Sequence, residues 1–118
     1  MTKYDFDSWD EEAASAAIAR IAETQTAFRY LIDAEDLIVE LPSKKIAKLP
    51  LSVTARDMLQ VAELEQRGEA ALLMQLLDNV GQKDTSALLQ DCSLALVAKI
   101  AMVYFDLIGQ ITGVALGE

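Results

Sequence analysis

Residues 94–116 constrain the fold of this chain most, because this segment is apolar almost throughout. If the segment is helical, its polar positions recur at intervals of seven, four and three residues and form one narrow stripe: Lys99, Asp106, Gln110 and Gly113. The rest of such a helix needs cover, because apolar surface of this extent is unfavourable in water. We therefore expect the remaining elements to pack on this helix, or to leave part of it free for a partner.

Residues 94–116 also have the length of a membrane span. Lys99 and Asp106 lie inside the segment, and each costs about 2.5 to 3.5 kcal/mol near the centre of a bilayer. No basic cluster flanks the segment. The sequence therefore favours a helix of a water-soluble fold and predicts no membrane partner.

The composition is that of a folded protein, since 53% of the 118 residues are hydrophobic and 25% are charged. This length favours a single domain over residues 1–118, in which we expect residues 1–7 to be flexible. The 19 acidic and 10 basic residues give a formal net charge of -9. Such a surface repels nucleic-acid phosphates, so we expect no nucleic-acid partner.

Few residue types that carry chemistry are present, because the chain has no histidine and a single cysteine, Cys92. This composition excludes Ser-His-Asp and Cys-His catalysis, an imidazole metal site, a zinc cluster and an internal disulfide. The acids Asp33, Glu35 and Asp36 lack the glycine and the terminal glutamate of a calcium loop, and the glycines lack phosphate-binding spacing. We therefore predict a protein that is not an enzyme, with no catalytic residues, no metal and no cofactor.

The N-terminal segment is acidic where a signal peptide is basic and then apolar, so we expect a cytoplasmic protein. Residues 8–11, Ser-Trp-Asp-Glu, have the form of a capping box and predict a helix that begins near Trp9. The apolar face of this helix is thin and rich in alanine, and its positions are Ala14, Ile18, Ile21, Gln25, Phe28 and Ile32. Such a face suits close packing within the chain or on a partner chain, and Trp9 can anchor on either.

Residues 24–41 allow two interpretations. The runs 28–32 and 37–41 are typical of strands and predict a β-hairpin, whereas the competing interpretation extends the first helix to about Asp33. In both cases we expect Pro42 to end the regular structure. Residues 42–50 hold three lysines and no acid, which is typical of a solvated loop.

Three further helical segments are expected after this loop. Ser52 or Thr54 can cap a second helix, with Asp57 three residues after Thr54, and this helix stops at Gly68. Residues 69–79 are expected to form a third helix with a broad leucine stripe. Residues 84–116 are either one bent rod or two helices. The fold class is therefore mainly α: a compact bundle of about four helices around the apolar C-terminal helix. A short β-hairpin near residues 28–41 is an alternative to helix in that part of the chain.

The middle of the chain resembles a known family. Over about residues 26–80, the order of short apolar runs, a Leu-Pro-Leu-Ser segment and an acidic helix with its glycine is similar to the tail assembly chaperones of long-tailed bacteriophages; the runs are 28–30, 36–42, 49–52, 65–69, 71–73 and 76–77. That resemblance implies a small, acidic, largely helical cytosolic factor in the host. It also implies binding to the long tape-measure protein, which is then handed to tail-tube subunits. The family has no catalytic residues to carry over.

The candidate protein-binding residues are large and apolar: Trp9, Phe28, Tyr104, Phe105, Ile108 and Ile111. Tyr104 and Phe105 are placed at the centre of a homo-oligomer through the C-terminal helix, because aromatic anchors dominate interface energetics. Burial of the same helix face inside a monomer is the competing interpretation. A different function is that of an acidic inhibitor, in which the acids of residues 1–40 mimic nucleic acid and block a nucleic-acid-binding enzyme.

Overall fold

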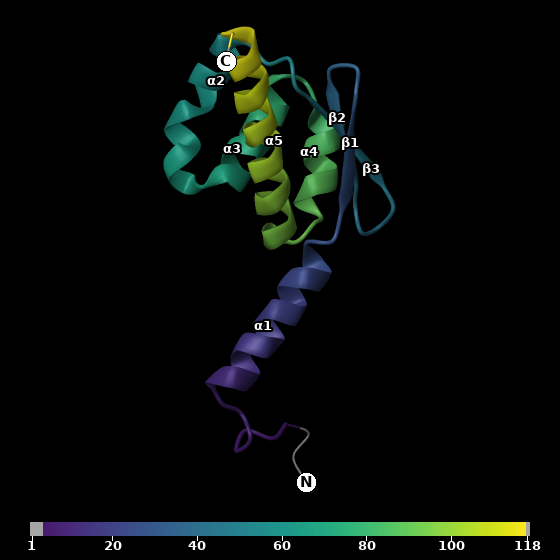
Figure 1. The fold of residues 1–118 in the computed structure, drawn as a ribbon, viewed down its shortest axis with the longest axis vertical. Coiled ribbons are helices and arrows are strands. Elements are labelled where there is room, and N and C mark those ends of the chain that lie inside the picture. The colour runs from purple at the N-terminus through teal and green to yellow at the C-terminus, as the bar shows by residue number, and fades with distance from the viewer. Residues whose placement is uncertain (1–3, 118) are drawn as a thin grey trace.

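The structure is a computed structural model that describes residues 4–117, apart from the side chains of Leu64 and Glu65. It has a helical arm and a body in which helices pack on a small sheet (Figure 1), and its extents are 61 × 28 × 25 Å. The elements follow in the order α1 (Glu11–Gln25), β1 (Arg29–Asp33), β2 (Asp36–Glu40), β3 (Ile46–Pro50), α2 (Ala55–Val61), a 3-10 helix η1 (Ala62–Arg67), α3 (Glu69–Asn79), α4 (Lys83–Gln90) and α5 (Leu94–Ala115).

The prediction of a compact, mainly α bundle of about four helices is wrong. Within residues 4–117 the chain forms five α-helices and an antiparallel sheet with the strand order β1-β2-β3, so the fold is mixed α and β. It is also elongated, because α1 has no buried residue and projects from the body as an arm. Of the predicted flexible residues 1–7, the first three lie outside the described part of the chain.

Of the two interpretations of residues 24–41, the β-hairpin is correct and the extension of the first helix to about Asp33 is wrong. Helix α1 ends at Gln25, where Thr26 donates a side-chain hydrogen bond to the carbonyl oxygen of Ala22. The apolar and aromatic run of β1 then pairs with β2, from Arg29 opposite Glu40 to Asp33 opposite Asp36. A two-residue turn joins the strands, and Ala34 in this turn has a φ of 56°.

The predicted loop at residues 42–50 is instead a turn followed by strand β3. Strand β2 ends at Glu40, as predicted from Pro42, and Pro42 is the first residue of a three-residue hairpin loop that leads into β3. Lys44 N–H donates to the carbonyl oxygen of Leu41 over 2.8 Å, and Lys44 takes the positive φ that such loops require, 72°. Along β3, buried Ala47 and Leu49 alternate with more exposed residues, as in a strand with one solvated face.

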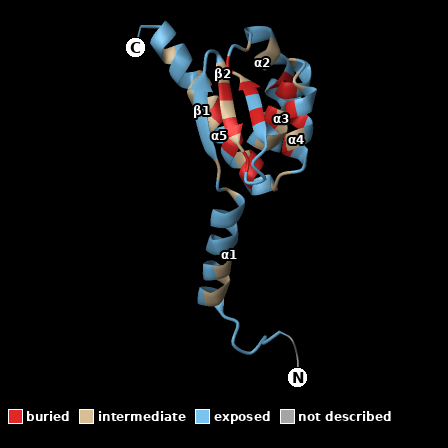
Figure 2. Cartoon of the chain, turned by 90° about the vertical axis from the view of Figure 1, so that its right-hand side faces the viewer, coloured by how far each residue is buried: buried red, intermediate tan, exposed pale blue. Residues whose placement is uncertain are grey.

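The core lies between one face of the sheet and helices α3, α4 and α5 (Figures 1 and 2). Fully buried side chains come from all of these elements: Leu37, Val39, Ala47 and Leu49 from the strands, and Leu73, Leu76, Leu77, Leu89, Ile100 and Tyr104 from the helices. The opposite face of the sheet has no helical cover (Figure 2). The fully buried residues of the segment 94–116 all lie in its first half, between Leu96 and Tyr104.

Local capping determines where the helices begin. Thr54 and Asp57 form the predicted capping box of α2. Asp10 caps α1 by accepting a hydrogen bond from Ala13 N–H, and the helix begins at Glu11, two residues after the predicted start at Trp9. The predicted capping box of residues 8–11 is therefore not the cap of this helix. Ser93 caps α5 by accepting from Leu96 N–H, and α4 and α5 are consequently two helices and not one bent rod.

Two side-chain hydroxyls attach the helices to the outer edge of β3. Thr85 Oγ1 on α4 donates to the carbonyl oxygen of Lys48 over 3.0 Å, and the Tyr104 hydroxyl on α5 donates to the carbonyl oxygen of Pro50 over 2.5 Å. Both carbonyls point away from β2, because Lys48 and Pro50 occupy the non-hydrogen-bonded pairs of the β2–β3 ladder. One edge of the sheet is thereby closed by α4 and α5.

Candidate functional site

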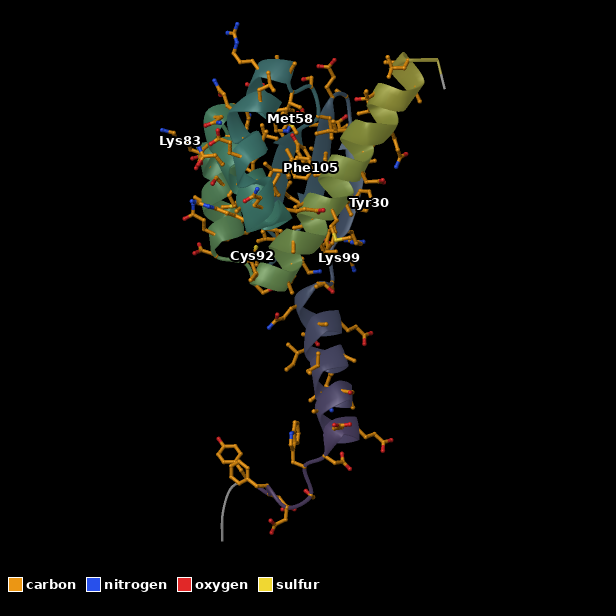
Figure 3. All side chains as sticks on the ribbon, turned by 90° about the vertical axis from the view of Figure 1, so that its left-hand side faces the viewer. Tyr30, Met58, Lys83, Cys92, Lys99 and Phe105 are labelled. Carbon is orange, nitrogen blue, oxygen red and sulfur yellow. The ribbon has the colours of Figure 1, made fainter. Side chains whose placement is uncertain are left out.

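An open apolar groove lies where α2, η1 and the start of α3 meet α5, and its volume is about 810 Å³. We call it the Phe105 groove, and its lining residues are Ala55, Met58, Leu59, Ala62, Gly68, Glu69, Leu72 and Phe105. Figure 3 shows Met58 and Phe105 close together between these elements. The volume is within the range of clefts that bind small-molecule ligands, about 300 to 1,000 Å³.

The short second helix creates this groove. Val61 is fully buried and anchors the end of α2, while Leu59, on a different side of the same helix, is 75% exposed. After η1 the chain turns at Gly68, whose φ of 100° is a conformation that glycine adopts readily. The turn starts α3 beside α2, so Met58 and Leu59 extend over a space that no side chain of the described chain fills.

Phe105 is held in place by its neighbour Tyr104. The two rings are 5.2 Å apart with an interplanar angle of 72°, an edge-to-face arrangement that is favourable for aromatic pairs. Tyr104 is fully buried and bonded to Pro50, so its ring is a fixed support. Phe105 itself is half-buried, with part of its ring on the core and part on the groove.

A second hollow of about 490 Å³ lies on the other side of Phe105 and is lined by Glu69, Met102, Val103, Phe105 and Asp106. Phe105 and Glu69 belong to both hollows, so the two form one continuous apolar surface with acids beside it. No lysine or arginine of the described residues lines either hollow. This charge distribution favours an apolar partner with basic side chains.

The structure separates the predicted protein-binding residues into three places. On α5, Phe105 lines the groove, Tyr104 is part of the core, Ile108 packs partly on the core and Ile111 is exposed near the free end. The buried ring of Tyr104 presents no surface to a partner, because the sheet covers it. A three-stranded sheet at this place was not expected in a helical bundle. A dimer centred on Tyr104 therefore has no free surface at that residue.

Phe28 and Trp9 lie far from the groove on the other parts of the chain. The ring of Phe28 is half-buried, with Lys99 Nζ 5.7 Å from its centroid and the Tyr30 ring 6.1 Å away. Trp9 is exposed at the free end of the arm, next to α1. Ile18 and Ile21 of α1 are exposed as well, so the apolar face of the arm has no cover from the body (Figure 2).

Met58, Leu59 and Leu72 were not among the binding residues predicted from the sequence. One signal was available: α2 has only seven residues, and two adjacent large apolar side chains, Met58 and Leu59, exceed what one buried stripe needs. The groove itself depends on how α2 and α5 are placed relative to each other. That placement follows from the sheet and from the turn at Gly68, which are not local features.

Cys92 lines a different hollow of about 340 Å³, together with residues of α1, α4 and the loop after β2. Burial, and secondarily the charge of Asp91, raises the pKa of the Cys92 thiol. The thiol also lies 3.5 Å from the carbonyl oxygen of Leu88, to which it donates. These conditions disfavour the thiolate that nucleophilic or metal chemistry requires. Among the described residues, no group of three or more acids and cysteines is placed to hold a metal ion.

Helix α5 is also long and apolar enough to cross a membrane by length and composition, and 28% of its most apolar window is buried in the body. Core helices of water-soluble proteins meet the same criteria, so this property indicates a membrane span only weakly.

No protein-family model, curated protein or solved structure matches the chain.

Proposed function

We propose that this protein is a non-catalytic binding factor that covers an apolar segment of another protein and keeps that protein soluble. The particular activity that fits best is that of a phage tail assembly chaperone for the tape-measure protein. The Phe105 groove is the observation that carries this proposal, because it is an open apolar surface on a chain with a net charge of -9. The resemblance of residues 26–80 to tail assembly chaperones supports the same function.

The groove fits an amphipathic helix better than a small polar molecule. Its walls are helices, and its described lining residues are aliphatic and aromatic, with Glu69 as the one charged residue among them. Apolar grooves between helices bind partner helices through side chains spaced by three and four residues. Met58 gives the wall adaptability, because the methionine side chain is unbranched and polarizable.

The α1 arm provides a second contact with the same partner. Ile18 and Ile21 are exposed on it, and acids in its first turn, Glu11 and Glu12, favour basic residues in the partner. Two weak contacts on one chain raise the affinity through effective concentration, provided that the partner spans both. A long polypeptide such as the tape-measure protein meets this geometric condition.

The experiment is co-expression with the tape-measure protein of the same genome, followed by measurement of the soluble complex. Leu59→Ser removes exposed apolar surface from the groove, and we expect about tenfold weaker binding with an unchanged melting temperature. Leu94→Ser is the matched control, since Leu94 is 77% exposed and Leu59 is 75% exposed, but Leu94 lies outside the groove. A tape-measure protein that stays insoluble, or equal effects of both substitutions, contradicts the proposal.

The second candidate is an acidic inhibitor of a nucleic-acid-binding enzyme. It is favoured by one observation: five acids at the free end of the arm are all exposed, namely Asp5, Asp7, Asp10, Glu11 and Glu12. Binding through these charges weakens steeply with salt, whereas binding through the Phe105 groove does not. A complex that persists at high salt and is weakened by Leu59→Ser indicates groove binding, whereas a complex that dissociates at high salt and is unaffected by Leu59→Ser indicates the inhibitor.

A further inference from the structure

The two edges of the sheet differ. The outer edge of β3 is closed by the hydroxyls of Thr85 and Tyr104, but β1 is exposed along its whole length (Figure 2). Its central residues, Tyr30, Leu31 and Ile32, are large, apolar and exposed on both faces of the strand. An open, apolar edge strand is a template for pairing with another strand.

The register of the hairpin identifies the free backbone groups. Asp33 and Asp36 flank the two-residue turn, so they form a hydrogen-bonded pair, and the pattern then alternates along the strand. Leu31 and Arg29 consequently direct their N–H and C=O groups toward β2. Tyr30 and Ile32 direct theirs outward, where no described residue pairs with them.

We propose that β1 pairs antiparallel with β1 of a second copy of this chain, around a two-fold axis at Leu31. In this register Tyr30 of each copy is opposite Ile32 of the other, and the outward N–H and C=O groups of both residues are satisfied. The product is a continuous six-stranded antiparallel sheet. This interface is independent of the Phe105 groove and of the function proposed for it.

The charges of β1 are complementary to themselves in this register. Arg29 of one copy lies opposite Asp33 of the other, and the two-fold axis produces this contact twice. Asp33 lies opposite the like charge of Asp36 in its own hairpin, and no hydrogen bond or ion pair of its side chain is present in residues 4–117. Arg29 is paired with Glu40 of its own hairpin over 2.7 Å, but its side chain is 80% exposed and a guanidinium has five N–H donors, so donors remain for a second carboxylate. An arginine across the new junction offsets the repulsion at Asp33, since opposite charges directly across strands stabilise a sheet. The order of charges along β1 therefore favours a second copy over an unrelated strand.

The second half of α5 lies on the same side of the molecule. Figure 2 shows this half leaving the body on the β1 side of the sheet, and Figure 3 shows Tyr30 beside α5. Ile111 and Val114 are exposed there. In the two-fold arrangement the α5 helices of both copies lie on one face of the joined sheet, where these side chains gain cover. The two α1 arms leave at opposite ends, because the paired β1 strands run in opposite directions.

Sedimentation velocity over a wide range of concentration tests the proposal, and the expected result is a reversible dimer. Ile32→Pro removes an outward N–H without removing a bond to β2, so it should abolish the dimer while the hairpin is retained. Ile46→Pro is the matched control: Ile32 and Ile46 are both 53% exposed, and both N–H groups point away from β2, but Ile46 lies on the opposite edge. This control should dimerise like the unmodified protein.

A charge exchange tests the same β1–β1 interface by a second route, which is needed if Ile32→Pro disturbs folding. Asp33→Arg places like charges opposite each other at both ends of the junction and should weaken dimerisation about tenfold. Adding Arg29→Asp to it restores opposite charges across the junction and should restore the dimer. Arg29→Asp alone is the control, because this substitution also breaks the ion pair with Glu40 of the same hairpin. A protein that remains monomeric at all concentrations overturns the proposal. A dimer that is insensitive to the charge exchange also overturns it, and places the interface elsewhere, such as on α5.

Discussion

The hydroxyl of Tyr104 donates a hydrogen bond to the carbonyl oxygen of Pro50, which joins the middle of α5 to the last residue of β3. This bond fixes α5 against the edge of the sheet at the point where the helix turns Phe105 toward its groove. A core contact between distant parts of the sequence thus determines the shape of the candidate binding surface.

Tyr104→Phe should lower the free energy of unfolding by about 1 to 2 kcal/mol. The substitution retains the ring but leaves the carbonyl oxygen of Pro50 without its donor. Chemical denaturation measured by circular dichroism gives the value. Tyr30→Phe is the control, since the Tyr30 ring is exposed and its hydroxyl has no hydrogen bond to any described residue, so it should have no effect. Equal stability of both variants would show that the bond contributes nothing.

Stability should also decrease in alkaline solution because of Tyr104. Burial, with a smaller contribution from the charge of Asp57, raises the pKa of Tyr104 well above its ordinary value of 10.0. Above that pH the unfolded tyrosine loses its proton while the folded one keeps it, so the native state binds more protons. The free energy of unfolding is therefore unaffected by this group below about pH 10 and falls as the pH rises further. Denaturation of Tyr104→Phe across the same pH range should lack this component, and an identical alkaline slope in both proteins would refute the assignment.

Elements with local signals were predictable from the sequence. The third helix, over residues 69–79, is confirmed as α3, and Thr54 and Asp57 form the expected capping box, because leucine spacing and capping act within a few residues. The sheet was not predictable in the same way. Pro42 marks the end of β2, but proline also begins the turn of a hairpin, so Pro42 alone does not predict the strand that follows. Strand β3 is stabilised by pairing with β2 and by Thr85 from α4, which are non-local contacts.

The residues of the candidate site were likewise only partly predictable from the sequence. Phe105 was identified from its aromatic character, but Met58 and Leu59 join it only because the turn at Gly68 places α2 over α5. Tyr104, its neighbour in the sequence, was expected at an interface and is in the core. Whether an aromatic residue of an apolar helix is buried depends on which elements cover the helix, and the sheet that covers Tyr104 is formed by non-local contacts.

Ala34→Gly should stabilise the β1–β2 hairpin. Ala34 has a φ of 56°, a left-handed conformation in which the Cβ atom costs about 1 to 2 kcal/mol and in which glycine has no such penalty. The greater flexibility of glycine in the unfolded chain offsets about 0.5 to 1 kcal/mol of the gain. We expect a higher melting temperature by differential scanning calorimetry. Glu35→Gly is the control at the next turn position, where φ is not positive, and it should destabilise the protein. A lower melting temperature for Ala34→Gly would contradict this account of the turn.

Thr85 and Ser86 are adjacent buried hydroxyl residues of α4 whose substitution should have opposite effects. Thr85 Oγ1 donates to the carbonyl oxygen of Lys48, whereas Ser86 Oγ, in a side chain that is 1% exposed, has no hydrogen-bond partner among the described residues. Thr85→Val keeps the shape but removes the donor, so it should lower the free energy of unfolding by about 1 kcal/mol.

Ser86→Ala removes a hydroxyl that was taken from water without compensation, and alanine also has the higher helix propensity. It should therefore raise the free energy of unfolding by about 1 kcal/mol. Urea denaturation of both variants beside the unmodified protein measures the two changes, and Ala87→Ser at the exposed neighbouring position reports the propensity contribution alone. A destabilised Ser86→Ala variant would mean that this hydroxyl has a partner in solution, and would remove the contrast between the two residues.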